Sequence, residues 1–162
     1  MQRYIKMRTK QNNSHFFLYY SRFAVSLHPQ NVIKMKDICC IGHVTKDKIV
    51  TPSSTVYMAG GTSFYFAYAI NQLPKDVSFS LITAMDPTEK EPVEKMLKAG
   101  IDVTLNPSRN TVFFENIYGD NPNDRKQRVL AKADPFTIQQ LEHVEAKVFH
   151  LGSLLSDDFS PE

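Results

Sequence analysis

A pair of adjacent glycines, Gly60 and Gly61, stands between an extended segment and an apolar helical pattern that continues to Leu73. Glycine does not stabilise a helix, so a glycine pair at a helix entrance is useful where another group must come close to the backbone. Asp47 is a second candidate, because a carboxylate accepts hydrogen bonds from two hydroxyl groups at once. On these residues alone two interpretations are open. One is a binding site for a hydroxylated ligand, and the other is a tight helix entrance beside a solvated turn.

Strands and helices alternate around these residues. Two short segments, 37–42 and 77–84, have the apolar pattern of strands buried on both faces, and residues 101–105 follow as a third strand. The helical pattern after the glycine pair is apolar all round and predicts a helix that buries nearly every face. The next helical pattern, residues 88–100, carries a capping-box spacing at Thr88 and Glu91. This alternation predicts an α/β fold with a Rossmann-type, largely parallel sheet.

The pattern then changes to strands without helices. Two extended segments, 111–119 and 125–133, are joined by the turn-forming sequence DNPND. They predict an antiparallel hairpin outside the parallel sheet, over about residues 108–133. We expect its arginines, Arg125 and Arg128, to be solvated charges.

The C-terminal part returns to the α/β pattern. A capping-box spacing at Thr137 and Gln140 predicts a further helix, and residues 146–152 form an apolar strand pattern that ends in glycine. Ser160 and Pro161 have the form of a helix start. We therefore interpret the chain as truncated.

The charges divide the chain into two regions. Residues 1–36 contain seven of the 19 Lys and Arg residues and no Asp or Glu. Residues 37–162 contain the other 12 basic residues and all 17 acidic ones, a net charge of −5. A mildly acidic body gives no support for nucleic-acid binding. No apolar run reaches the ~18 residues of a membrane-spanning helix, so we expect no membrane partner.

The basic head, residues 1–36, has three candidate explanations. It is moderately apolar after a basic start, as in a signal peptide, but Arg22 interrupts the apolar core and no clean cleavage site follows. The second candidate is an arm for a membrane surface or a nucleic acid. We favour the third, a poorly ordered extension outside the fold, with Met35 as a possible natural start of translation.

The two cysteines are sequence neighbours, Cys39 and Cys40, inside an apolar segment. Neighbouring cysteines rarely form a disulfide, so the pattern predicts buried thiols in a reduced, cytoplasmic protein. No spacing of Cys and His resembles a zinc site, and we expect no metal site and no catalytic residue in this chain.

From Asp37 onward the order of these motifs resembles the N-terminal half of the PfkB family of ribokinase-like carbohydrate kinases. The first strand ends in IGHVTKD, like the family's strand, glycine, turn and aspartate. The glycine pair at a helix start is similar to the family's sugar-binding motif, and LITAMDPTE to its strand followed by Gly-x-Asp. The hairpin is similar to the β-clasp lid of these enzymes, and VFHLGSLLSDDFSPE to their mid-chain strand and helix. The resemblance covers residues 37–162.

The resemblance implies a ribokinase-like fold and ATP-dependent phosphorylation of a sugar or nucleoside hydroxyl, with Mg²⁺ on the phosphates. Asp47, Gly60 and Gly61 would then be substrate-binding residues. One face of the lid would cover the sugar, either that of Phe114 and Asn116 or the alternate face. Lid hairpins in such enzymes pair between subunits, so a homodimer is a further expectation.

The chain also departs from the family pattern. Tyr65 stands where the family has an asparagine that hydrogen-bonds sugar hydroxyls. The family's Gly-Ala-Gly-Asp segment, which supplies the anion hole and the catalytic aspartate, has no counterpart in this sequence. We therefore expect the chain to be the substrate-binding half of a kinase, inactive alone. The alternatives are a non-catalytic sugar- or nucleoside-binding module and an unrelated Rossmann-like domain, although the latter would need a Gly-x-Gly-x-x-Gly motif after the first strand.

Overall fold

The computed structural model describes residues 16–20, 23–27, 35–74, 76–121 and 123–159. The chain divides into two compact units, Met1–Lys34 and Met35–Glu162. In the first unit, strands β1 (Phe16–Tyr20) and β2 (Phe23–Leu27) pair antiparallel. The predicted helix start at residues 160–162 lies outside the described residues.

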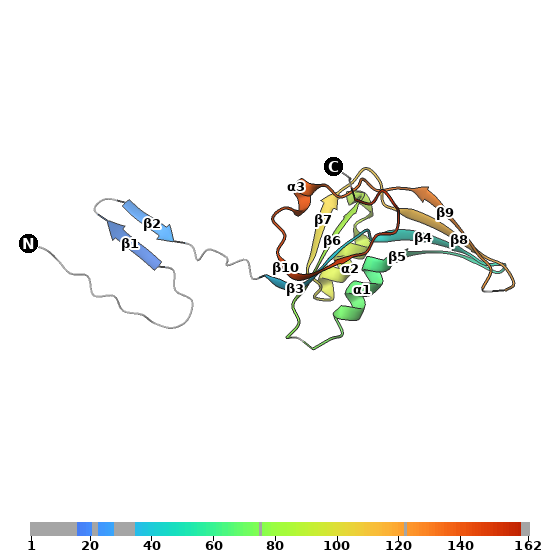
Figure 1. Cartoon of the computed structure of the whole chain (residues 1–162), viewed down its shortest axis with the longest axis horizontal. Helices are drawn as coiled ribbons and strands as arrows, with labels where there is room; N and C mark the ends of the chain where they lie inside the picture. Colours follow the sequence, from blue (N-terminus) through green and yellow to red (C-terminus); the bar gives the residue numbers. More distant parts are fainter. Residues whose placement is uncertain (1–15, 21–22, 28–34, 75, 122, 160–162) are drawn as a thin grey trace, which may run out of the picture. The chain divides into compact units, whose positions relative to one another are not determined.

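The second unit contains a four-stranded parallel sheet, with strand order β10-β3-β6-β7 (Figure 1). Its strands lie close to the ranges that the apolar segments predict: β3 Lys36–Ile41, β6 Phe79–Met85, β7 Val103–Pro107 and β10 Ala146–Leu151. Alternate residues of β3 face opposite sides, so Cys40 joins one hydrophobic cluster with Leu81 and Cys39 joins another with Phe136. The sheet is therefore buried on both faces at its centre, and the prediction of a parallel α/β sheet is confirmed. Both thiols are free and buried, as expected.

The second sheet of this unit has the strand order β5-β4-β8-β9 and extends to one side of the parallel sheet (Figure 1). Its strands are β4 Thr45–Val50, β5 Thr55–Gly60, β8 Phe113–Tyr118 and β9 Arg125–Ala131. Strands β8 and β9 form the antiparallel hairpin that the sequence predicts. Strand β4 is antiparallel to β5 and parallel to β8, so the hairpin belongs to a complete sheet of its own.

Within the residues that the structure describes, three helices and one 3₁₀ turn connect the strands: α1 Thr62–Ile70, η1 Pro87–Glu89, α2 Glu91–Lys98 and α3 Ile138–Leu141. In the described parts of the chain, no helix combines the length and the apolar character needed to cross a membrane. The capping box at Thr137 and Gln140 is present and begins α3. In α1, however, Ser63 and Ala67 are the buried residues and Tyr65 is 55% exposed. The prediction that this helix buries nearly every face is wrong, because one side of it faces solvent.

The predicted capping box at Thr88 and Glu91 is also wrong. The carboxylate of Asp86 accepts a hydrogen bond from the backbone N–H of Thr88 at 2.8 Å and caps η1 instead. Helix α2 begins afterwards at Glu91, without a side-chain cap, and has Pro92 in its first turn. An aspartate two residues before an unpaired backbone N–H is itself a cap signal. Asp86 therefore provides the side-chain cap in this segment, and Thr88 does not.

Candidate functional site

Asp47 lies within strand β4, so its predicted place in a turn is wrong. Lys46 and Lys48 flank it, and their charges conceal the strand in the sequence. The hydroxyl of Thr45 donates to Asp47 Oδ1 at 2.7 Å, and Oδ2 has no hydrogen bond among the described residues. Burial raises the pKa of this carboxyl, while the Thr45 hydroxyl and the charge of Arg125 lower it in part. Asp47 therefore has one oxygen held in place and one open to a ligand.

Other atoms of the chain come close to the two glycines. A Cβ atom on Gly60 would lie 2.4 Å from Asp47 Oδ2 and 3.1 Å from the hydroxyl of Thr45. A Cβ atom on Gly61 would lie 2.7 Å from the carbonyl oxygen of His43, and Gly61 has a positive φ of 94°. A side chain at either position would displace these groups. The structure thus brings Asp47, Gly60 and Gly61 together, and Gly60 makes room for the carboxylate.

Residues on the two faces of the second sheet differ in character. The side chains of Lys48 and Arg128 both contact Glu115, and the Lys48 Nζ to Glu115 Oε1 distance is 2.9 Å. These three residues form the charged face, and Arg128 is exposed, as the sequence predicts, while it also pairs with Glu115. Because successive residues of a strand point to opposite faces, Asp47 lies on the other face, with Phe114 opposite it in register. We call this the Asp47 face.

A cavity of about 600 Å³ opens on the charged side of strands β4 and β5, against helices α1 and α2. Lys46 and Glu89 pair at 2.5 Å in its wall, which holds the pKa of the Glu89 carboxyl below its ordinary value. Its other lining residues include Tyr57, Tyr68 and Lys95. Asp47, Gly60 and Gly61 do not line this cavity, so it is distinct from the site that the sequence predicts.

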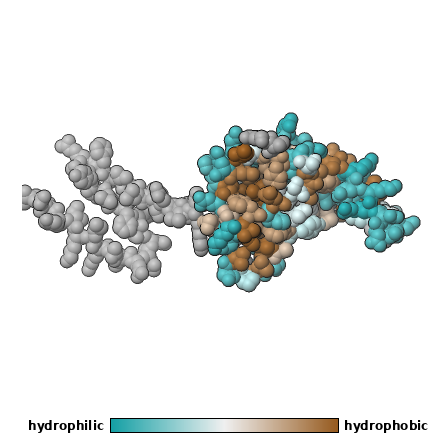
Figure 2. Space-filling model, viewed as in Figure 1, coloured by the Kyte–Doolittle hydropathy of each residue, from teal (hydrophilic) through white to brown (hydrophobic). Residues whose placement is uncertain are grey.

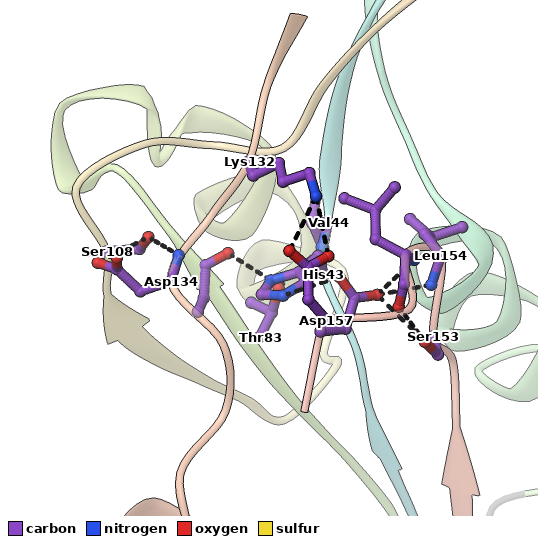
Figure 3. Close-up of polar contacts among 12 residues, drawn as sticks. His43, Val44, Thr83, Ser108, Lys132, Asp134, Ser153, Leu154 and Asp157 are labelled. Atoms are coloured by element: carbon purple, nitrogen blue, oxygen red, sulfur yellow. Dashed lines mark hydrogen bonds and ion pairs between the residues drawn. The ribbon is translucent and has the colours of Figure 1, made fainter. Parts of the chain in front are cut away.

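A buried polar cluster lies beyond the carboxyl ends of β3, β6 and β10 (Figure 3). His43 Nδ1 donates to the carbonyl oxygen of Ala84 at 3.2 Å, and its ring stacks on Phe136 with the centroids 4.6 Å apart. The carboxylate of Asp158 accepts hydrogen bonds from the backbone N–H groups of Leu154 and Leu155 at 2.6 and 3.0 Å. Sequence analysis missed this cluster. Its one signal is that His43 directly follows the glycine at the end of the first strand.

The cluster holds in place the segment that leads into strand β4, which carries Asp47. The segment Gly42–Val44 connects β3 to β4, and the N–H of Val44 donates to the hydroxyl of Thr83 at 2.8 Å (Figure 3). His43 contributes the carbonyl that lies against Gly61. The position of strand β4, and with it Asp47, is therefore tied to the carboxyl edge of the parallel sheet, where open α/β sheets bind ligands. Across the described ranges, no three His, Cys, Asp or Glu side chains are grouped to hold a metal ion.

No protein-family model matches the chain, and the comparison with curated proteins finds no similar sequence. Solved structures do match. A pyrophosphate-dependent kinase in the ribokinase family, in complex with sulfate, is 26% identical with a TM-score of 0.64 over 76% of this chain. A pyrophosphate-dependent kinase in the ribokinase family, complexed with a pyrophosphate analogue and myo-inositol, is 27% identical with a TM-score of 0.64 over 76% of this chain.

A third match is a pyrophosphate-dependent myo-inositol-1 kinase, 24% identical with a TM-score of 0.66 over 75% of this chain. In that protein, replacing an asparagine and a serine with leucines produces a myo-inositol-3 kinase. This chain covers 43%, 42% and 40% of the chains of these three structures, taken in the order above. The fold is therefore ribokinase-like, and the resemblance to ribokinase-family kinases is confirmed.

Proposed function

We propose that the second unit binds the hydroxylated acceptor of a ribokinase-like kinase, a cyclic polyol or a sugar, on the Asp47 face. The observation that carries the proposal is the free Oδ2 of Asp47, which is half-buried beside Gly60 while Thr45 holds Oδ1. A carboxylate with one fixed and one free oxygen can accept hydrogen bonds from vicinal hydroxyls. The complex of a 27% identical neighbour with myo-inositol supports a cyclic polyol as the first ligand to test.

The phosphoryl donor of the whole kinase would be ATP, as the resemblance implies, or pyrophosphate, which the neighbours use. Phosphoryl transfer depends on positioning and on cations that neutralise the transferred group. The sequence has no counterpart of the Gly-Ala-Gly-Asp segment that supplies the anion hole and the catalytic aspartate in the family. We therefore propose that this chain holds and orients the acceptor and alone transfers no phosphoryl group. Pairing of lid hairpins in a homodimer stays a prediction.

Calorimetry with the 162-residue chain tests the proposal directly. The ligands are myo-inositol, ribose and a nucleoside, each compared between the wild type and Asp47→Ala. Loss of a charged hydrogen-bond partner costs roughly 1.5–3 kcal/mol, so Asp47→Ala should weaken binding of the best ligand about 10- to 150-fold. Lys46→Met is the matched control, because Lys46 directly precedes Asp47 in β4 and its side chain points to the charged face.

Three outcomes decide the proposal. Binding that falls in Asp47→Ala and persists in Lys46→Met supports it. Binding that instead falls in Lys46→Met would place the ligand in the cavity beside Glu89. A wild-type chain that binds none of the three ligands contradicts the proposed function. A coupled assay with ATP and with pyrophosphate checks the second part, and turnover above a no-protein control would show that the chain is a complete catalyst.

A further inference from the structure

The cavity beside Glu89 is lined by aromatic rings as well as by charged side chains. Tyr57 of β5 and both Phe64 and Tyr68 of α1 contribute to its lining, together with the buried side chain of Met85. Its volume of about 600 Å³ is that of a typical ligand pocket, and such pockets have mainly apolar and aromatic walls with a few polar groups. The cavity therefore has the size and the lining of a small-molecule site, separate from the proposed acceptor site.

Two ion pairs supply the charges of the cavity lining, and these charges balance. Lys46 Nζ lies 2.5 Å from Glu89 Oε1, and the two side chains are 42% and 35% exposed. Lys95 Nζ lies 2.8 Å from Glu91 Oε1, and both of these side chains are mostly exposed. A ligand with one charge is attracted by one member of a pair and repelled by the other. A ligand with both charges is attracted by both members.

The less exposed pair, Lys46 and Glu89, retains hydrogen-bonding capacity. An ammonium group has three N–H donors and a carboxylate has two acceptor oxygens, so one bond between them leaves both groups able to bind further partners. An α-amino acid carries an ammonium and a carboxylate on a single carbon atom, close enough together to face one ion pair. Placed with opposite charges facing, it adds two charge-assisted hydrogen bonds and leaves the bond between Lys46 and Glu89 intact.

We propose that this cavity is a second binding site of the chain and that it takes a free aromatic α-amino acid. Lys46 receives the carboxylate of the ligand and Glu89 its ammonium, while its aromatic side chain packs against the rings of the lining. Lys46 belongs to the second sheet, and Glu89 ends the 3₁₀ turn that follows β6 of the parallel sheet. A bound amino acid would therefore link the two sheets. The proposal does not depend on the proposed function, because the acceptor would lie on the Asp47 face.

Three probes with the same indole ring test the proposal on the 162-residue chain. L-Tryptophan has both charges, tryptamine has only the ammonium, and indole-3-propionate has only the carboxylate. The chain contains no Trp, so indole fluorescence reports the probe without a protein background. L-Tryptophan should bind about 10-fold more tightly than either analogue, which corresponds to 1.4 kcal/mol for the charged contact that each analogue lacks.

Two variants should shift the preference between the analogues in opposite directions. Glu89→Gln leaves the charge of Lys46 unpaired, so tryptamine should bind more weakly and indole-3-propionate more tightly. Lys46→Met leaves the charge of Glu89 unpaired and should have the reverse effect. Each variant should change the ratio of the two affinities by about 10-fold. Glu94→Gln is the matched control, because Glu94 pairs with Lys90 on α2 away from the cavity lining, and it should leave the ratio unchanged.

A smaller fraction of folded protein lowers the apparent affinity for both analogues equally, so loss of stability alone does not move their ratio. The proposal is overturned if the wild-type chain binds none of the probes, or if L-tryptophan binds no more tightly than both analogues. It is also overturned if either variant fails to move the ratio in the expected direction. Tryptophan binding that weakens as the protein concentration rises would assign the cavity to a second copy of the chain instead. None of these results changes the binding of myo-inositol, which tests the proposed function separately.

Discussion

His43 Nε2 lies 3.6 Å from Asp158 Oδ1, with both side chains almost wholly buried. Because His43 Nδ1 carries the proton donated to Ala84, neutral His43 presents a bare nitrogen to the carboxylate, and Nε2 has no hydrogen-bond partner. Burial lowers the pKa of His43 below its ordinary value of about 6.5, although the Ala84 carbonyl and Asp158 oppose this shift. The folded protein therefore holds this histidine neutral.

The first prediction is a loss of stability in mild acid. With a lowered pKa in the folded state, the unfolded chain binds more protons as the pH falls through about 6.5, so the free energy of unfolding falls with it and rises again toward pH 7. Thermal melts between pH 5 and pH 7.5 measure this slope. His43→Phe keeps the stacking on Phe136 and should flatten the slope, whereas His143→Gln, at an exposed site, should preserve it. An unchanged slope in His43→Phe contradicts the prediction.

The second prediction concerns the contact between Ser63 and two glycines. A Cβ atom on Gly152 would lie 2.2 Å from the hydroxyl oxygen of Ser63, and its next contacts are at 3.5 Å. Gly152→Ala should therefore destabilise the protein by about 1–3 kcal/mol through overpacking. The double variant with Ser63→Ala should recover most of this loss in urea unfolding.

Gly42 provides the control for this cycle. A Cβ atom there would meet Ser63 at 2.1 Å and also the backbone carbonyl oxygen of Gly152 at 2.6 Å. Ser63→Ala should thus fail to rescue Gly42→Ala, because the backbone contact remains. Equal rescue of both glycine variants would show that helix α1 moves away from the strand ends more easily than this packing indicates.

The third prediction is that neither thiol reacts in the folded protein. Both cysteines are fully buried, and burial raises the pKa of Cys40 to about 11 and also raises that of Cys39. The thiolate is the reactive form, so a disulfide reagent at pH 8 should label the folded chain only as fast as it opens. Denaturant should release both cysteines of the sequence. Rapid labelling of one thiol without denaturant would place that strand at the surface.

The fourth prediction is self-association along strand β10, which forms an edge of the parallel sheet. Val148, Phe149 and Leu151 are 55%, 47% and 60% exposed, so apolar side chains on both faces of this strand meet solvent. Figure 2 shows hydrophobic surface on the side of the second unit that carries β10 in Figure 1. Such an edge favours pairing with another chain.

Light scattering over a range of concentrations measures this association. Val148→Lys should lower the apparent mass, because a charge on an edge strand disfavours pairing. Glu145→Lys adds positive charge just before the strand and is the matched control. A wild-type chain that stays monomeric at high concentration, or a Val148→Lys variant that associates equally, would contradict this prediction.

Local patterns in the sequence determined the parallel sheet and the hairpin. The segment around Cys39 and Cys40 is continuously apolar because both of its faces are buried, and such a pattern is visible without any tertiary contact. The association of Asp47 with the glycine pair was also predicted, although only through the order of motifs.

Only the tertiary structure decided what surrounds these residues. Strand β4 carries lysines whose charges are satisfied by Glu89 and Glu115, from distant parts of the chain, so its sequence does not look like a strand. The same sheet pairing decides that Asn116, and not Glu115, shares a face with Asp47. His43 lies near the start of the second unit's sequence and Asp158 lies near its end. Their contact exists because parallel strands bring their carboxyl ends to one edge of the sheet. Long-range pairing of this kind leaves no local pattern in the sequence, since the charge or hydrogen-bonding group of each residue is paired by a residue far away along the chain.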